Sequence, residues 1–443
     1  MPGDLCDMTE TSLEEVIQEK DFVALLQREA EPFFRLVNSL LAMPEGRWGK
    51  RHYHHLVQEA DELETFLDDH GAADNRTFHM FRELVASIRW VAAAGFSVSH
   101  LVARLPGYGV DDSFGPQLLI DGRTDMLAVR AFLNGTTRDL IDALYEEAAG
   151  IDVSVPSEPL PEDTFAAPPA RRRLPQNVGE EELVDEEQKI AEVASKFLAA
   201  SDMIERARVH RIEDPTERRR FLESCCSEEQ ARVYQATVHN LQSTYDTHIK
   251  QTVLEAKDAR LSKLRGFSSV ALHLLEGVTH LMHFVERHES AARSDEAGHG
   301  IGRIIERAKV EDVVLNQLLY WAAQSMLHGR TIAEDLLPAY TNVQELEVEL
   351  PDNLKLHARP ASLIVRIVGR YGTPVELTVE GETCSAGSIL ELLVTVGSHP
   401  DARLFSFRGD ENPLRDIALL FQYGLGEEGL ATLPPQLSYL SES

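Results

Sequence analysis

The 443-residue chain has few cysteines, few cations and no long apolar run. Its four cysteines include the adjacent pair Cys225 and Cys226 and make neither a disulfide framework nor a CxxC metal motif. The 43 Lys and Arg against 73 Asp and Glu give a net charge of −30, which argues against a nucleic-acid or anionic-membrane partner. No stretch approaches the roughly 18 apolar residues of a membrane span, and the acidic first residues are unlike a signal peptide. We therefore expect a cytoplasmic protein without membrane insertion.

Shifts in composition predict four segments along the chain. Residues 1–150 have apolar side chains at helical spacing and are predicted to form a helical domain of unknown function. Residues 151–182 are rich in proline and in blocks of like charge, which is typical of a linker. Helical spacing returns over 183–340, which predicts a helical bundle or coiled-coil-like domain. Residues 345–443 follow a different pattern and form the last predicted domain.

The most regular helical pattern lies between residues 264 and 288. Apolar residues recur every seven positions in two series, with a histidine at the end of the second: Leu264, Ala271, Val278 and Val285, then Phe267, Leu274, Leu281 and His288. Such a seam indicates a helix packed in a bundle or coiled coil. Because these helices often carry dimer contacts, a homo-oligomer through this region is one expectation.

Histidines in the helical segments suggest a metal site or a phosphorylated histidine, but a structural interpretation is favoured. His273, His280 and His283 lie on the regular helix, and Glu296 and His299 have the Glu-x-x-His spacing of di-metal bundles. No second helix supplies matching ligands, so we interpret these residues as surface or boundary histidines. The same interpretation applies to an N-terminal group: His52, His54, His55, Glu59 and Glu62. We expect neither a metal nor a cofactor.

After Tyr340 the apolar period changes from helical to alternating. "ELEVEL" (345–350), "TPVELTVEG" (373–381), "ETCSA" (382–386) and "ARLFSFRG" (402–409) have strand character, and the segments between and after them have helical stripes. The order βαββαβα predicts a four-stranded antiparallel sheet with three helices on one face over residues 345–424. The predicted fold class is thus multidomain, with mostly α-helical bundles up to about residue 340 and a C-terminal α+β domain.

The junction between the first strand and the first helix of this domain reads "LHARPAS". His357 is expected where the helix begins, so the unpaired first-turn N–H groups and the helix dipole would favour an anion there. Pro360 suits a first turn, and Arg359 supplies a planar fork for phosphate oxygens. Positive surroundings should keep the imidazole neutral and nucleophilic. Together these groups predict a site that accepts and hands on a phosphoryl group.

Three segments together, "LHARPAS", "SAGSILELL" and "VGSHPDARLFSFRGDE", resemble HPr, the histidine-containing phosphocarrier of the bacterial phosphoenolpyruvate-dependent sugar phosphotransferase system. The resemblance implies that His357 takes a phosphoryl group on its δ-nitrogen from enzyme I for sugar-specific acceptor proteins, with Arg359 beside it. Ser388 matches the serine that an HPr kinase/phosphorylase modifies in some lineages. Ile389 and Leu390 match the apolar patch that docks enzyme I and the acceptors.

Two departures from the family pattern and a large extra region keep several functions open. Lys355 and Gly387 stand where glycine and lysine, respectively, are common in the family, and about 340 helical residues precede the domain. Our interpretation is a phosphocarrier, rather than an enzyme with its own turnover, coupled to a regulatory role of the helical domains. The alternatives are a regulatory adaptor acting on a target protein and a binding module that is no longer phosphorylated.

Overall fold

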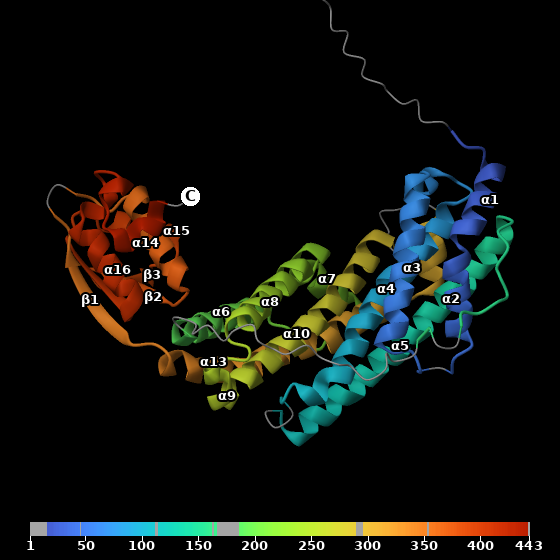
Figure 1. The fold of residues 1–443 in the computed structure, drawn as a ribbon, viewed down its shortest axis with the longest axis horizontal. Coiled ribbons are helices and arrows are strands. Elements are labelled where there is room, and N and C mark those ends of the chain that lie inside the picture. The colour runs from blue at the N-terminus through green and yellow to red at the C-terminus, as the bar shows by residue number, and fades with distance from the viewer. Residues whose placement is uncertain are drawn as a thin grey trace, which may run out of the picture. The chain divides into compact units, whose positions relative to one another are not determined.

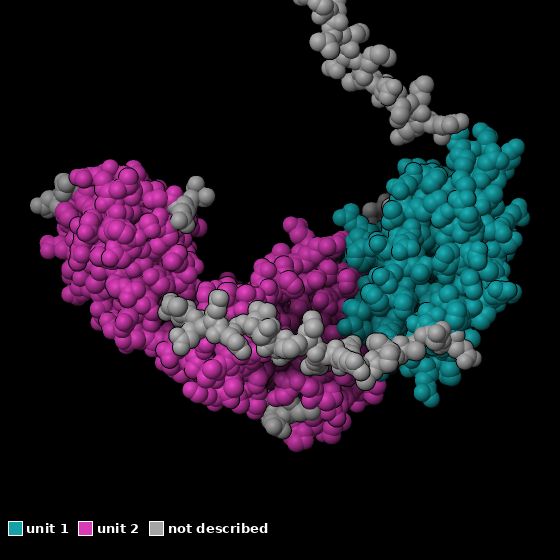
Figure 2. Space-filling model, in the orientation of Figure 1, with its two compact units in different colours: residues 1–96, 130–168, 283–307 teal, residues 97–129, 169–282, 308–443 magenta. Residues whose placement is uncertain are grey.

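The computed structural model describes residues 16–44, 46–110, 114–161, 164–165, 186–288, 296–351 and 354–441, and the side chains of 288 and 296–299 are not described. Most of the predicted linker, residues 151–182, lies outside these ranges, as do the side chains of His288, Glu296 and His299. The first of the two compact units comprises residues 1–96, 130–168 and 283–307, and the second comprises 97–129, 169–282 and 308–443 (Figure 2).

Up to residue 339, every secondary-structure element of the described chain is helical (Figure 1). The α-helices are α1 (Glu19–Glu29), α2 (Glu31–Leu41), α3 (Lys50–Asp69), α4 (His79–Arg104), α5 (Pro116–Gly150), α6 (Glu186–Arg206), α7 (Pro215–Cys225), α8 (Glu228–His248), α9 (Val253–Lys257), α10 (Ala259–His283), α11 (Glu296–Ile304), α12 (Arg307–Asp312) and α13 (Tyr320–Leu336). Short 3-10 turns are η1 (Ala72–Asp74), η2 (Leu105–Gly107) and η5 (Leu337–Ala339), and π-helical segments are η3 (Phe284–His288) and η4 (Val313–Leu319). The predicted helical class is confirmed.

Side-chain caps explain where several of these helices begin. Asp214 precedes α7 and accepts a hydrogen bond from the backbone N–H of Glu217 at 2.8 Å, while Pro215 occupies the first turn. Ser227 and Gln230 form a reciprocal capping box at the start of α8.

An ion pair joins two helices of the first unit. Arg82 Nε of α4 lies 2.7 Å from the carboxylate of Asp68, near the end of α3.

Helix α10 is buried on more sides than its regular seam predicts. The seven apolar residues of the seam, six in α10 and Val285 in η3, are all buried, but so are four α10 residues outside it: Val270, Leu272, Leu275 and Met282. A seam of this type leaves the remaining faces to solvent, whereas a central helix contacts neighbours around most of its circumference. The structure therefore gives α10 the position of a core helix.

One helical stretch, His79–Gly107, is long and apolar enough to cross a membrane by length and composition. Within the structure, however, 67% of its apolar window is buried against protein. The described residues contain no other helix of this kind. Burial at this level is what the core helix of a helical domain shows.

The C-terminal domain has the predicted element order. It consists of β1 (Val343–Glu349), α14 (Ala358–Tyr371), β2 (Val375–Val379), β3 (Glu382–Ser385), α15 (Ile389–Ser398), β4 (Leu404–Asp410) and α16 (Glu411–Gln422), and all of these except β4 are labelled in Figure 1. The sheet order is β1-β4-β2-β3 and every neighbouring pair is antiparallel. The prediction of a four-stranded antiparallel sheet is confirmed.

One face of this sheet holds the core and the other faces outward. Val375, Leu377 and Val379 on β2 are buried, as are Phe405 and Phe407 on β4. They share a hydrophobic cluster with apolar residues of all three helices: Ile364 and Ile367 of α14, Leu392 and Val396 of α15, and Leu414 and Ile417 of α16. On the outward face, the exposed Glu376 and Arg408 lie opposite each other in register. This alternation is the reason that the period-two pattern marks the strands.

A C-terminal extension after α16 completes the core of this domain. It contains the short turns η6 (Gly424–Gly426), η7 (Leu430–Thr432) and η8 (Pro435–Ser441), and it buries Leu437 and Leu440 completely. The hydroxyls of Tyr371 and Tyr439 both donate to Asp416 Oδ2 at 2.7 Å. Burial and these bonds raise the pKa of both tyrosines, that of Tyr371 to about 12, so both hydroxyls stay protonated donors.

Replacing Tyr439 with phenylalanine is expected to destabilise the C-terminal domain by about 1 kcal/mol, because a buried hydrogen bond to Asp416 is lost. Hydrogen exchange of the sheet amides in the intact protein measures this change. Tyr423→Phe is the matched control, since that side chain is 49% exposed. Equal protection in the two variants would show that the hydrogen bond from Tyr439 to Asp416 does not stabilise the domain.

Candidate functional site

His357 is the N-cap residue of α14. Its backbone is extended, with φ −115° and ψ −167°, and its carbonyl accepts the first helical bond, from Ala361 N at 3.0 Å. The ring Nδ1 accepts a long hydrogen bond from the backbone N–H of Arg359, at 3.4 Å. The side chain is 53% exposed. The lone pair of Nδ1 therefore lies at a helix N-terminus with access from solvent.

A carboxylate lies at the other nitrogen of the same ring. His357 Nε2 is 3.0 Å from Oε1 of Glu427, which follows the η6 turn. This is an ion-pair distance, but the ring N–H is not aligned with the oxygen as a strict hydrogen bond requires. The two ring nitrogens thus meet different groups: a backbone N–H at Nδ1 and a carboxylate at Nε2. Sequence reasoning missed Glu427.

Two cations flank His357 without a carboxylate partner. Among the described residues, neither Lys355 nor Arg359 forms a side-chain hydrogen bond or ion pair, and both side chains are exposed. Other arginines of this domain are engaged: Arg366 donates to the Leu440 carbonyl and Arg403 to the Pro351 carbonyl. In a chain with net charge −30, two such cations within two residues of a helix N-cap favour an anion there.

Comparison with protein families decides what this domain is. Residues 344–402 match the family model for the PTS HPr component phosphorylation site. The C-terminal region is an HPr-like domain. No curated protein and no solved structure matches the chain. The match ends well before Glu427, so the extension that brings this carboxylate to His357 lies outside it.

The remaining predicted residues of the HPr-like domain gather at the start of α15. Ser388 is the N-cap, and its Oγ accepts a hydrogen bond from Glu391 N at 3.4 Å. Ile389 and Leu390 are exposed in the first turn, and Val394 extends the apolar surface one turn further, with 57% exposure. Val394 was not singled out from the sequence. The sequence did indicate an exposed apolar residue in this helix, because it has more apolar residues than one buried helix face can hold.

The two departures from the family pattern both have a structural explanation. Lys355 does not have a positive φ, so a lysine at this position imposes no left-handed strain on the loop. At Gly387 a Cβ atom would lie 3.3 Å from Val368 Cγ1 of α14, closer than most side-chain contacts. A glycine at position 387 therefore allows the loop before α15 to lie close against α14.

Histidines of the helical regions have local partners. His273 Nδ1 lies 3.0 Å from Glu276 Oε2, and its ring packs against His100. His52 Nδ1 accepts a hydrogen bond from Gly49 N at 2.9 Å and so caps α3, while burial lowers the pKa of its ring. Across the described part of the chain, no group of three or more His, Cys, Asp or Glu side chains is arranged to hold a metal ion.

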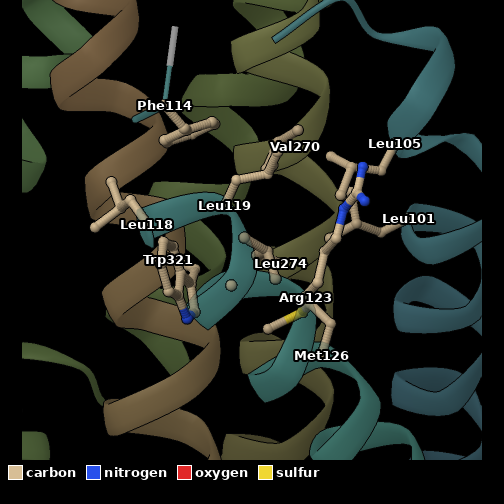
Figure 3. Close-up of a pocket in the computed structure, with 11 residues that line it drawn as sticks. Leu101, Leu105, Phe114, Leu118, Leu119, Arg123, Met126, Val270, Leu274 and Trp321 are labelled. Atoms are coloured by element: carbon tan, nitrogen blue, oxygen red, sulfur yellow. The ribbon is translucent and has the colours of Figure 1, made fainter. Parts of the chain in front are cut away.

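An apolar pocket in the helical part of the second unit has few polar groups (Figure 3). It is lined by side chains of α4, η2, α5, α10 and α13, including Leu101, Leu118, Met126, Leu274 and Trp321. Its volume of about 40 Å³ leaves room for no more than a few water molecules. Trp321 Nε1 donates to Asp125 at 2.8 Å beside it. We regard this pocket as a packing gap between helices.

Proposed function

We propose that the HPr-like domain is a phosphocarrier that accepts a phosphoryl group on Nδ1 of His357 and passes it on. The observation that carries this proposal is the placement of Nδ1 at the N-terminus of α14, with Lys355 and Arg359 two residues away in the sequence on either side. An incoming phosphoryl group would meet N–H donors, a guanidinium and an ammonium. These groups supply the positioning and charge stabilisation on which phosphoryl transfer depends.

The donor is proposed to be enzyme I, charged from phosphoenolpyruvate, and the acceptors sugar-specific proteins or a regulatory target. Support comes from the match to the PTS HPr phosphorylation site and from the apolar surface of Ile389, Leu390 and Val394. Exposed apolar groups of this size next to a polar site are typical of docking surfaces. The helical regions, with no family match, are proposed to couple the phosphorylation state to that target.

Incubation of the intact chain with enzyme I and phosphoenolpyruvate, followed by mass spectrometry, tests this proposal. We expect a single added phosphoryl group that is lost in acid and stable in alkali, as a phosphoramidate is. An unchanged mass with an active donor would leave the binding-only module as the better account. An acid-stable group would indicate a hydroxyl acceptor and would also contradict the assignment to His357.

Ser388→Asp is expected to slow phosphoryl exchange at His357 severalfold without unfolding the domain. The aspartate caps α15 as the serine does, and the helix dipole tolerates its charge. It also places a negative charge beside the apolar docking surface, where it repels a phosphorylated partner. The exchange rate with enzyme I measures the effect. Ser388→Asn is the neutral control, and an exchange rate in Ser388→Asp equal to that of the control would limit Ser388 to capping.

A further inference from the structure

The first helix after the predicted linker contacts the HPr-like domain. Helix α6 and this domain belong to the same compact unit. Gln188, in the first turn of α6, makes two hydrogen bonds to the domain: its Nε2 donates to the Tyr371 carbonyl at 2.9 Å, and its Oε1 accepts from Asn412 Nδ2 at 3.1 Å. Tyr371 is the last residue of α14, and Asn412 lies in the first turn of α16. One side chain of α6 thus joins the ends of two helices of the domain.

The backbone of the HPr-like domain also lies close to α6. Gly372, the C-cap of α14, has a left-handed conformation with φ 66°. A Cβ atom at this position would lie 2.5 Å from Glu192 Cγ of α6. A larger residue would therefore meet both backbone strain and a clash with α6. The contact depends on the last turn of α14 and on its glycine cap.

The charges of α6 at this contact suit the end of a helix. The last carbonyls of α14 form the negative end of its dipole, where positive charge is favoured. Glu192 pairs with Lys189 at 2.8 Å and with Lys196 at 2.7 Å, so the three side chains together are positive. Burial opposes the ionisation of Glu192, but hydrogen bonds from the two lysines outweigh it and lower the pKa of the carboxyl.

The contact with α6 and the candidate phosphorylation site lie at opposite ends of one helix. His357 is the N-cap of α14 and Gly372 is its C-cap. The 14 residues between them span about 21 Å. Surface charges are screened over about 8 Å at physiological ionic strength, so an effect of one end on the other has to pass through the helix. Ile389 and Leu390 are exposed and stay free for a donor.

We propose that α6 is the element through which the helical region reads the phosphorylation state of His357, an inference that rests on the proposed function. Without phosphate, the Arg359 N–H makes only a long bond to Nδ1, at 3.4 Å. Phosphoryl oxygens give the first-turn N–H groups charged acceptors, which stabilises the helix. Helix formation is cooperative, so the last turn of α14 opens less often. Because α6 binds that turn, phosphorylation strengthens the contact, and by linkage the contact favours phosphorylation.

Hydrogen exchange of the intact chain, before and after incubation with enzyme I and phosphoenolpyruvate, tests this inference. Peptides from residues 186–193 and 371–375 report on the two sides of the contact. In wild type we expect phosphorylation to slow exchange severalfold on both sides. Gln188→Ala should exchange faster there before phosphorylation, and phosphorylation should then leave residues 186–193 unchanged. This variant still gains the phosphoryl group, because His357 lies at the other end of the helix.

Two further variants serve as a second test and as a control. Asn412→Ala removes one of the two hydrogen bonds from the side of the HPr-like domain. It should weaken the contact less than Gln188→Ala does, because the bond to the Tyr371 carbonyl remains. Gln235→Ala is the matched control, a half-buried glutamine of α8 that makes no hydrogen bond to the described residues. It should match wild type before and after phosphorylation.

The outcomes separate this inference from the proposed function. Wild type that gains no phosphoryl group overturns both. Wild type that gains it without any change of exchange in residues 186–193 overturns only the role of α6. An equal response of wild type and Gln188→Ala would also overturn that role. A larger phosphorylated fraction of Gln188→Ala than of wild type, at equilibrium with phosphorylated enzyme I, would reverse the sign of the linkage and contradict the inference as well.

Discussion

His357→Ala is expected to abolish the acid-labile phosphate of the intact chain, since it removes the ring nitrogen that lies at the N-terminus of α14. The effect on folding should be small. The ring is 53% exposed, and its capping bond to Arg359 N is long, at 3.4 Å. Loss of a cap costs about 0.5–2 kcal/mol, and so weak a bond belongs at the low end. Intact mass spectrometry after incubation with enzyme I and phosphoenolpyruvate measures the first effect, and thermal melting the second.

His399→Ala is the matched control for this experiment. His399 belongs to the same domain, and its Nε2 pairs with Glu382 Oε2 at 2.9 Å, much as His357 pairs with Glu427. It lies at the C-cap of α15, however, where the helix dipole disfavours an anion. Full labelling of His399→Ala and none of His357→Ala is the expected result. Residual acid-labile phosphate in His357→Ala would show that another histidine accepts the phosphoryl group.

Arg359→Ala is expected to leave the nucleophile in place but slow its phosphorylation by about ten- to a hundred-fold. The exposed guanidinium has no hydrogen-bond or ion-pair partner among the described residues, so its removal leaves no buried charge unpaired. What is lost is a charge-assisted fork to the phosphoryl oxygens, worth about 1.5–3 kcal/mol. Rapid-quench measurement of the transfer rate from phosphorylated enzyme I gives the size of the effect.

Arg408→Ala controls for the loss of one positive charge, because that side chain is exposed on the outward face of the sheet, paired with Glu376 at 3.5 Å. It should transfer at the wild-type rate. If Arg359→Ala and Arg408→Ala behave alike, Arg359 does not contact the phosphoryl group.

Lys355→Gly should also slow the transfer of the phosphoryl group, as Arg359→Ala does. The lysine adds positive charge near His357 and does not strain the loop.

Local patterns were sufficient to predict the elements of the HPr-like domain. The period-two alternation of Val375, Leu377 and Val379 reflects a sheet with one buried face, and Pro360 and Gly372 fall in the first turn and at the end of α14. In a sheet with one buried face, apolar and polar residues alternate along the strands. The resemblance to HPr then located His357, and the structure places it at the helix N-terminus that its neighbours indicated.

The position of Glu427 beside His357 was not predictable, because it depends on the path of the chain after α16. The sequence "YGLGEEG" shows a turn through its glycines, but nothing local indicates that Leu425 enters the core with a positive φ. Nor did the seam of α10 reveal how many neighbours the helix has, because a seven-residue period reports one contact face. Both failures concern contacts between segments far apart in the sequence.

The order of strands in the sheet affects how readily copies of this protein aggregate at high concentration. β1 and β3 are the edges, and a free edge offers unpaired N–H and C=O groups to a strand of another molecule. β3 has only four residues, too few for a long pairing. β1 has seven, but Glu345, Glu347 and Glu349 alternate along it. Two copies approaching through β1 would oppose these charges, so the glutamates protect the edge against aggregation.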